Sequence, residues 1–485
     1  MSDANDCSSK DRLKVLEGWI ERGLGVNAKG NFKSKILDDF NGESYRKLVA
    51  SEDIPEQAAI VSIPDSILLN TRTIPKSFKE KYSGLNSVQC LTLYLARNCP
   101  YSQGIKLITT EPDSFFGPYL DSLPKGFPDV PLTWALKAVL GDLDGVFCDD
   151  DKAIFLLEDR HEVYDLNQGQ NRPEDFSRFM SQSTAKACDK VTLRFIKDWK
   201  ALAACFRGDS LIITVAELLW AWLVVNTRCV WYDLGCENHC DNITLAPVID
   251  MANHTIQSDV TLIVTPQTLT MFSSHPRGLF KSPKSQQLIS SSLKSSETSS
   301  SKGEICFKKD QEIRFSYGPH GNSTLLAEYG FVVLDETNPW DFIDITDSIE
   351  ILFEKIGEDG NIKREMLQNL NYWGEYTVQC NPVNPSHRVL VALRLLHTPL
   401  KREAQWLDHA GGNTDDMGSQ TECLVSKSLK EIFEDIEEQL VQTSKSFDYK
   451  STSDSNLISK FAFDCLSKIV KDEMNAVRSF LNDHM

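Results

Sequence analysis

The sequence predicts an α+β fold, because short strand-like segments and longer helical patterns occupy different stretches of the chain. Residues 48–50 and 59–63 have the composition of short strands, and the turn-prone segment 51–55 separates them. Two more strands are expected at 245–249 and 260–264, in the second half of the sequence. No glycine-rich turn leads from the first strands into a helix, which argues against a dinucleotide-binding fold.

Helical patterns fill the stretch between the two groups of strands and the end of the chain. Residues 87–207 are mostly helical in pattern, and a helix at 215–226 is apolar on nearly all sides, which is typical of a buried helix. Beyond Pro339 three more helices are expected, at 386–396, 424–440 and 457–481. We therefore expect a β-rich domain that is split by a helical insertion and followed by an all-α C-terminal domain.

The chain of 485 residues is long enough for two or three domains, and its composition is globular, with 41% hydrophobic and 25% charged residues. Its 13 cysteines are scattered and odd in number, and the N-terminus lacks the apolar stretch of a signal peptide. No apolar run approaches the ~20 residues that a membrane-spanning helix needs. These features predict a protein with reduced thiols in the cytoplasm or the nucleus.

The net charge of −18 restricts the kinds of partner that the protein can have. Binding to nucleic-acid phosphates needs clustered Lys and Arg, so we expect no direct nucleic-acid partner. An acidic surface favours encounter with a basic protein, although the same charge also serves solubility alone. Charge by itself therefore names no partner.

One chemically informative segment is Asp250-Met251-Ala252-Asn253-His254, which follows an expected buried strand. Small and polar residues at such a place provide partners for backbone groups at the strand end. By itself, the segment fits a turn in which the Asp and Asn side chains satisfy local backbone donors.

A second informative segment ends a strand at Ser316-Tyr317-Gly318. It places a tyrosine hydroxyl at a strand tip, next to a glycine that is free to adopt a positive φ. Taken alone, a buried tyrosine with a satisfied hydroxyl explains it. A third segment begins at Asn322 and continues through residues 325–332, where we expect a helix that Gly330 caps.

Together the three segments resemble the C-terminal half of a SET domain, in which an Asn-His segment and a Ser-Tyr-Gly strand end are threaded into a pseudoknot. Further matches resemble the Rubisco large-subunit methyltransferase-like branch, whose members modify non-histone proteins. These matches are the aromatic and proline-rich stretch 114–134, the helix 220–228 that ends in Thr-Arg, and the leucine-rich helix 389–396 with its embedded arginine. The resemblance covers nearly the whole chain in order.

The resemblance implies a division of the chain into four parts. Residues 1–86 and 211–335 would form the two halves of the SET domain, with a Ser-rich surface loop at 281–303 in the second half. Residues 87–210 would form the helical insertion, and residues 336–485 would form a helical substrate-binding domain.

The resemblance also implies S-adenosylmethionine as the cofactor. Asn253 and His254 would bind its amino-acid and adenosyl portions, and Asp250 would support them. Arg228 would lie near the methionine carboxylate, where a planar guanidinium suits a planar anion.

The same resemblance assigns the reacting centre. Tyr317 would be the catalytic residue and would also contact the cofactor, because its hydroxyl would orient the attacking amine and the methyl group. Tyr329 and Phe331 would line the substrate channel. An amine that enters an aromatic, poorly solvated channel loses its charge more easily, which suits attack on a sulfonium methyl.

The first cofactor segment departs from the family pattern. Family members have Gly-x-Gly-Leu-x-Ala, whereas this chain has Tyr45-Arg46-Lys47-Leu48-Val49-Ala50. The glycines let the backbone approach the cofactor, and Tyr45 and Lys47 replace both of them. Two outcomes are open: the loop shifts so that Arg46 contacts the cofactor together with Leu48, or cofactor binding is weakened.

Four possible zinc ligands lie close together in the sequence: Cys229, Cys236, His239 and Cys240. Their spacing is not that of a recognised zinc knuckle, and the adjacent His239 and Cys240 close a tetrahedron poorly. We therefore expect ordinary loop cysteines and no metal.

The resemblance implies an S-adenosylmethionine-dependent protein-lysine N-methyltransferase that acts on a non-histone protein, either a ribosomal protein or a translation factor. One alternative is a protein-histidine methyltransferase, because one member of the wider branch modifies a histidine. The other is a SET-derived binding protein without turnover. This alternative arises because Tyr45 and Lys47 replace the two glycines of the first cofactor segment. We expect a monomer with a basic protein substrate and no membrane partner.

Overall fold

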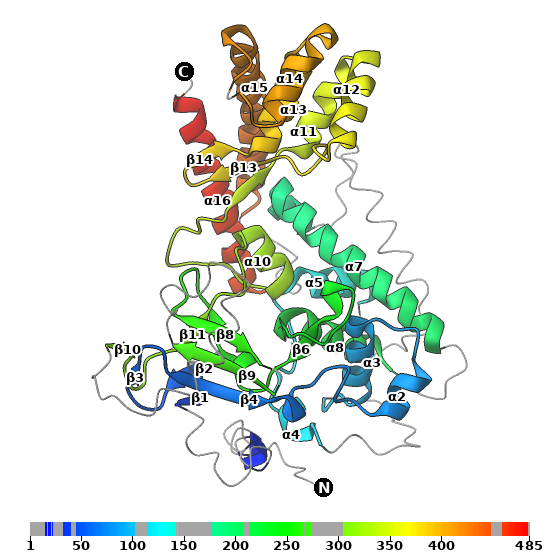
Figure 1. Cartoon of the computed structure of the whole chain (residues 1–485), viewed down its shortest axis with the longest axis vertical. Coiled ribbons are helices and arrows are strands. Elements are labelled where there is room, and N and C mark those ends of the chain that lie inside the picture. The colour runs from blue at the N-terminus through cyan, green and yellow to red at the C-terminus, as the bar shows by residue number, and fades with distance from the viewer. Residues whose placement is uncertain are drawn as a thin grey trace. The chain divides into compact units, whose positions relative to one another are not determined.

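The computed structural model describes residues 15, 16, 18–20, 22, 33–39, 45–101, 115–141, 143, 176–206, 213–265, 267–273, 304–414, 416–447 and 458–483. The Ser-rich loop predicted at 281–303 lies outside them. The chain divides into two compact units (Figure 1). The first unit comprises Met1–Phe127, Asp142–Asp151 and Lys197–Pro319, and the second comprises Pro128–Gly141, Lys152–Ile196 and His320–Met485. The four-part division expected from the sequence stays a prediction.

The strands of the first unit are short, and segments from distant parts of the chain share one sheet. A three-stranded antiparallel sheet has the order β4 (Ala59–Pro64), β9 (Thr268–Ser273), β8 (Val260–Val264). Figure 1 shows blue β4 beside green β9. The other strands form two-stranded pairs. The strand β1 (Ser34–Asp39) pairs with β2 (Tyr45–Ala50), and β3 (Ile54–Pro55) pairs with β10 (Ile305–Phe307). The strand β5 (Cys229–Trp231) pairs with β6 (Ile243–Leu245), and β7 (Asn253–His254) pairs with β11 (Arg314–Phe315).

The strands predicted at 48–50, 59–63 and 260–264 are confirmed by β2, β4 and β8. Branched side chains explain β4, because Ile60, Val61 and Ile63 are fully buried and such residues pack well on a pleated surface. The strand predicted at 245–249 is wrong in its extent, since β6 ends at Leu245. The chain then enters a 3₁₀ turn at Ile249–Met251, which places Asp250 on a turn.

The first unit contains two packed helices, α3 (Ser87–Arg97) and α8 (Val215–Arg228). Both begin with a capping box, in which a side chain at the N-cap and one in the first turn bond to each other's backbone N–H. The prediction of a buried helix at 215–226 is confirmed, because the residues of α8 from Leu218 to Val225 are buried. Further helices of this unit are α2 (Lys76–Lys81) and α4 (Gly117–Leu120). The helix α7 (Gln182–Phe206) is divided between the units, with its residues up to Ile196 in the second unit.

The second unit is mainly helical. Its helices are α5 (Pro131–Leu140), α10 (Asn322–Tyr329), α11 (Thr346–Lys355), α12 (Glu358–Asn369), α13 (His387–His397), α14 (Glu403–Ala410), α15 (Ser419–Lys445) and α16 (Lys460–Asp483). The three helices predicted beyond Pro339 are confirmed by α13, α15 and α16. The long helices α15 and α16 pack together, with the Phe433 and Phe480 rings stacked at 4.2 Å between centroids.

A small sheet refines the expectation of an all-α C-terminal part. It has the order β12 (Phe342–Asp344), β13 (Thr377–Cys380), β14 (Val383–Pro385). These strands are antiparallel and only three or four residues long, so the sequence shows no alternation that would have predicted them.

The arginine embedded in the leucine-rich helix α13 is part of a buried ionic network. Arg394 is 7% exposed, and its Nε and Nη2 donate to both carboxylate oxygens of Glu422 at 2.8 and 2.9 Å. Its Nη1 lies 2.8 Å from His409 Nε2. A bidentate pair of this kind fixes α13 against the start of α15, because a planar guanidinium matches a carboxylate in only a few orientations.

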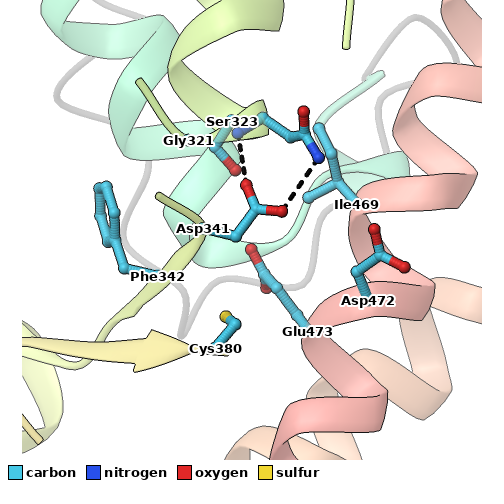
Figure 2. Close-up of a pocket in the computed structure, with 9 residues that line it drawn as sticks. Gly321, Ser323, Asp341, Phe342, Cys380, Ile469, Asp472 and Glu473 are labelled. Atoms are coloured by element: carbon cyan, nitrogen blue, oxygen red, sulfur yellow. Dashed lines mark hydrogen bonds between the residues drawn. The ribbon is translucent and has the colours of Figure 1, made fainter. Parts of the chain in front are cut away.

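A small pocket in the second unit gathers carboxyl side chains from different elements (Figure 2). Its lining residues are Gly321, Asn322, Ser323, Asp341, Phe342, Cys380, Ile469, Asp472 and Glu473. Asp341 accepts hydrogen bonds from the Asn322 backbone N–H at 2.5 Å and from Asn322 Nδ2 at 3.0 Å, drawn as dashed lines in Figure 2. Burial raises the pKa of Asp341 to about 6 and that of Glu473 to about 8. Near neutral pH the Glu473 carboxyl is therefore mostly protonated, whereas that of Asp341 is mostly ionised.

The helix α10 ends at Gly330 as the sequence predicts, with φ +80° in the left-handed region. A Cβ at this position would lie 2.9 Å from the backbone carbon of Asp129 and 3.0 Å from the nitrogen of Val130. Gly330 is therefore required both for its φ and for the close approach of another backbone segment.

Replacing Gly330 by alanine is expected to lower the free energy of unfolding by about 2–4 kcal/mol, from the unfavourable φ and the clash together. Urea unfolding of the full chain would measure the loss. Gly374 is the matched control, since its φ is +82° but a Cβ there would meet nothing within 4 Å. A loss at position 330 no larger than that of Gly374→Ala would contradict the role of the close contact.

Within the described parts of the chain, no helix has the length and apolar character needed to cross a membrane.

Candidate active site

Two of the three motifs lie next to each other in the first unit. β7 carries Asn253 and His254, and it pairs in parallel with β11, which immediately precedes Ser316-Tyr317-Gly318. The Cα register sets Asn253 opposite Arg314 and His254 opposite Phe315. β11 also contacts β8 (Figure 1), so the pair lies at the edge of the main sheet. The expectation that these motifs form one site is supported by this pairing.

Tyr317 is fixed at both ends by the 250–254 motif. Its backbone N–H donates to His254 Nδ1 at 3.1 Å, and the two rings lie 5.2 Å apart. Its hydroxyl donates to the carbonyl oxygen of Ala252 at 2.9 Å. The phenol oxygen and a backbone carbonyl oxygen are therefore held side by side, which is an arrangement that can orient an amine and a methyl group.

The Asn253 side chain ties this motif to the first cofactor segment. Its Nδ2 donates to the carbonyl oxygen of Arg46 at 3.1 Å and to Glu312 Oε1 at 2.8 Å. The Leu48 side chain is fully buried, and its carbonyl accepts a hydrogen bond of 2.8 Å from Ile313 N–H, just before β11. Residues of β2, β7 and β11 thus form one hydrogen-bonded framework.

The Arg46 side chain extends from β2 towards the loop after α4. Its Nη1 donates to the carbonyl oxygen of Ser122 and lies 3.8 Å from Met251 Sδ. The guanidinium therefore lies beside the 250–254 motif. Contact between Arg46 and the cofactor stays a prediction.

Arg228 and Asp250 form the charged centre of the site. Arg228 Nη1 donates to the Asp250 carbonyl oxygen at 2.7 Å and lies 3.8 Å from Asp250 Oδ2. The Asp250 side chain is fully buried, whereas that of Arg228 is 20% exposed. The Tyr119 hydroxyl donates to Asp250 Oδ2 at 2.6 Å.

Burial controls the protonation of this centre. Burial raises the pKa of Asp250, and the nearby Arg228 guanidinium and the Tyr119 hydrogen bond lower it in part. Burial and the Asp250 carboxyl together raise the pKa of Tyr119 well above its usual range, so the phenol stays protonated and can donate. Burial also raises the pKa of the adjacent Cys229 thiol, which is a poor metal ligand in that form.

Tyr329 and Phe331 belong to the second unit, at the end of α10. Their ring centroids are 6.1 Å apart, and Tyr329 lies 6.4 Å from His320. Burial raises the pKa of Tyr329 to about 12, with a smaller contribution from Glu328. These aromatic side chains form a compact group, and their role as channel walls stays a prediction.

Among the described residues, no group of three or more His, Cys, Asp or Glu side chains is placed to hold a metal ion. The ring of His239 instead stacks on Trp231 at 5.8 Å between centroids.

Two residues of the site escaped the sequence analysis. Tyr119 contacts Asp250 across 131 positions of sequence, and Glu312 contacts Asn253 across 59. The aromatic and proline-rich stretch 114–134 pointed to the segment that contains Tyr119, but no local pattern distinguishes this tyrosine from its aromatic neighbours.

Known proteins resemble large parts of the chain. The model of the ribosomal lysine N-methyltransferase 2 C-terminal domain matches residues 341–483. Ribosomal lysine N-methyltransferase set11 of Schizosaccharomyces pombe is 25% identical over 80% of this chain and 76% of that protein. Ribosomal lysine N-methyltransferase 2 of Saccharomyces cerevisiae is 29% identical over 38% of this chain and 34% of that protein.

The solved structure of Rubisco LSMT bound to AdoMet superposes with a TM-score of 0.54 at 14% identity, covering 98% of this chain and 91% of that one. Rubisco LSMT bound to sinefungin and monomethyllysine gives a TM-score of 0.56 at 12% identity, with the same coverage. The chain has the fold of Rubisco LSMT, and the proteins similar to it in sequence include ribosomal lysine N-methyltransferases. The α+β fold class predicted from the sequence is confirmed, and these similarities support the predicted branch. The β7–β11 pair is the place where the two motifs meet.

The donor set of the site fits S-adenosylmethionine. Among the described residues, no acceptor lies within hydrogen-bond distance of the buried Nε of Arg228. A buried guanidinium N–H without a partner is costly, and an anionic group such as a methionine carboxylate would satisfy it. The first unit therefore offers a buried cationic donor that suits a carboxylate.

Proposed function

We propose that the protein is an S-adenosylmethionine-dependent protein-lysine N-methyltransferase whose substrate is a ribosomal protein. The observation that carries the proposal is the Tyr317 hydroxyl, which is held 2.9 Å from the Ala252 carbonyl oxygen where the two SET motifs meet. The relatives named as ribosomal lysine N-methyltransferases support the choice of lysine and of a ribosomal protein.

Several residues are proposed to hold the cofactor. Arg228 would bind its carboxylate through the buried Nε, and Asn253 and His254 would contact it along β7. Asp250 would support this group, and Leu48 and Arg46 would complete the pocket from β2.

When bound, S-adenosylmethionine would supply an electrophilic methyl group on a positively charged sulfur, which would leave with the electrons of the broken bond as a neutral amine nitrogen took the methyl group. The Tyr317 hydroxyl, whose proton is donated to the Ala252 carbonyl oxygen, would accept a hydrogen bond from an N–H of the amine and so keep the amine lone pair directed at the methyl carbon. The Ala252 carbonyl oxygen supplies negative partial charge beside a methyl group that carries positive charge. Tyr329 and Phe331 are proposed to exclude water from the amine, which favours its neutral form.

The substrate is proposed to be basic, because the chain carries a net charge of −18. We further propose that the protein acts as a monomer, in the cytoplasm or the nucleus, and without a nucleic-acid partner.

The test is methyl transfer from radiolabelled S-adenosylmethionine to extracts of cells that lack this protein. A labelled band of ribosomal origin is expected with the unmodified protein and is expected to be missing with Tyr317→Phe. Mass spectrometry of the labelled peptide identifies the modified side chain. Label on a histidine would replace lysine by histidine as the target, and no affinity for S-adenosylmethionine by calorimetry would favour a binding protein without turnover.

A further inference from the structure

Tyr119 is completely buried, and its hydroxyl has a specific partner in the active site. The residue lies on α4, a single turn of helix, and its hydroxyl donates to Asp250 Oδ2 at 2.6 Å. The Asp250 side chain is also fully buried, so no water competes for this bond. The bond is short and shielded from solvent, which strengthens it electrostatically.

Asp250 lies on a strained turn. Val248, at the start of the 3₁₀ turn Ile249–Met251, has φ +72°, which is a rare conformation for a branched side chain. Such a conformation persists only where surrounding contacts hold it. Tyr119 holds the side chain of Asp250 and Arg228 holds its carbonyl oxygen at 2.7 Å, so the turn is fixed from two directions.

The same turn presents the carbonyl group that contacts Tyr317. Ala252 N–H donates to the Ile249 carbonyl at 3.2 Å, and the Ala252 carbonyl accepts from the Tyr317 hydroxyl at 2.9 Å. Asp250 and Ala252 are two residues apart in one short turn. A shift of the Asp250 side chain therefore moves the carbonyl oxygen that sets the position of the Tyr317 hydroxyl.

We propose that Tyr119 is a positioning residue for methyl transfer, which acts through Asp250 and the 249–252 turn to hold the Ala252 carbonyl and the Tyr317 hydroxyl in register. Tyr119 touches neither of the reacting groups in this proposal. The inference rests on the proposed methyltransferase function and extends it by a residue from a segment that comes before the two SET motifs.

The first test replaces Tyr119 by phenylalanine, which removes the hydroxyl and keeps the buried ring. The turnover number is expected to fall by about 10-fold to 100-fold, the range that small misplacements of reacting groups produce. The KM values for S-adenosylmethionine and for the protein substrate are expected to stay within about two-fold, because neither binds to Tyr119 in the proposal.

Tyr101 is the matched control. Its hydroxyl donates to the carbonyl oxygen of Leu123 at 2.6 Å, in the same part of the first unit but away from Asp250. Tyr101→Phe therefore measures the general effect of losing a tyrosine hydroxyl bonded to this loop. Its turnover number is expected to equal that of the unmodified protein.

The second test asks whether Tyr119 acts through the catalytic tyrosine. In a double-mutant cycle, Tyr119→Phe is expected to reduce the residual turnover of Tyr317→Phe by less than about two-fold, because the hydroxyl that it positions is then absent. A merely structural role would give the same fractional loss in both backgrounds. Introducing 4-aminophenylalanine at position 119 restores an N–H donor at the same point and is expected to recover most of the turnover.

Each result decides the proposal. Equal turnover numbers for Tyr119→Phe and Tyr101→Phe would overturn it, and so would additive losses in the cycle. Failure of Tyr119→Phe to fold would also overturn it, because the hydroxyl would then be needed for the fold itself. Absence of methyl transfer by the unmodified protein would overturn the proposed function as a whole, which distinguishes that failure from a failure of the Tyr119 assignment.

Discussion

Replacing Tyr317 by phenylalanine is expected to lower the turnover number by about 100-fold to 1,000-fold, the range for loss of one positioned hydrogen-bonding group at a reacting centre. The substitution removes only the hydroxyl that bonds the Ala252 carbonyl oxygen at 2.9 Å. The backbone N–H of residue 317 still donates to His254 Nδ1, so the β7–β11 pair keeps its geometry. Single-turnover transfer of labelled methyl groups would measure the loss.

Cofactor binding separates this effect from general damage to the site. The dissociation constant of S-adenosylmethionine, measured by calorimetry, is expected to change less than about five-fold in Tyr317→Phe, since Arg228 and β7 are untouched. Tyr101→Phe again provides the control for a lost hydroxyl. Unchanged turnover in Tyr317→Phe would refute the catalytic role of this residue.

The free energy of unfolding is expected to fall as the pH rises from 5 to 8.5. Replacing Glu473 by glutamine is expected to abolish most of this fall. Glu473 lies in the pocket of the second unit and accepts a hydrogen bond from the Ser181 hydroxyl at 2.9 Å. Burial, with smaller contributions from the carboxyls of Asp341 and Asp472, raises its pKa from 4.5 to about 8, although hydrogen bonds from Ser181 and Ser183 lower it in part. Glutamine keeps the acceptor for Ser181 and has no charge to bury.

The sign follows from proton binding in the two states. Below pH 4.5 both the folded and the unfolded chain hold the proton, and the stability is complete. As the pH rises towards 8, the unfolded chain releases a proton that the folded chain keeps, so the free energy of unfolding falls by roughly 4–5 kcal/mol. Urea unfolding of the full chain at several pH values would follow the fall and its disappearance in Glu473→Gln.

Asp464→Asn is the control on the same helix. Its side chain is 55% exposed and pairs with Lys460, one turn earlier on α16. This variant is expected to keep the pH dependence of the unmodified protein. Equal pH dependence in Glu473→Gln and in the unmodified chain would mean that the buried carboxyl does not control stability in this range.

Much of the site follows from sequence, because its parts are short motifs at the ends of strands. The segments 250–254 and 316–318 each carry polar residues where a strand ends, and β7 and β11 bring them together in parallel. The C-cap of α10 at Gly330 could also be predicted, because glycine is the residue that most easily adopts the left-handed conformation at a helix end.

Contacts between distant segments could not be predicted. The Tyr119 hydroxyl and Asp250 are joined only because α4 is folded against the 3₁₀ turn, and neither segment shows a pattern that encodes the other. The positive φ of Val248 could not be predicted from the sequence either, because a valine before Ile249 is typical of a continuing strand. The strands β12 to β14 are too short for alternation to appear.

The hydrogen-bonded framework of the site has a consequence for how the protein is made. Arg46 and Tyr119 are synthesised early, yet their partners at Asn253 and Asp250 emerge much later, and Tyr317 later still. Contacts between such distant positions form slowly, since the chain must close long loops before they contribute to stability. A nascent chain on the ribosome therefore lacks the partner strand of β7 and the Tyr317 hydroxyl until the residues up to Tyr317 have left the exit tunnel, and we expect fragments that end before that point to transfer no methyl groups.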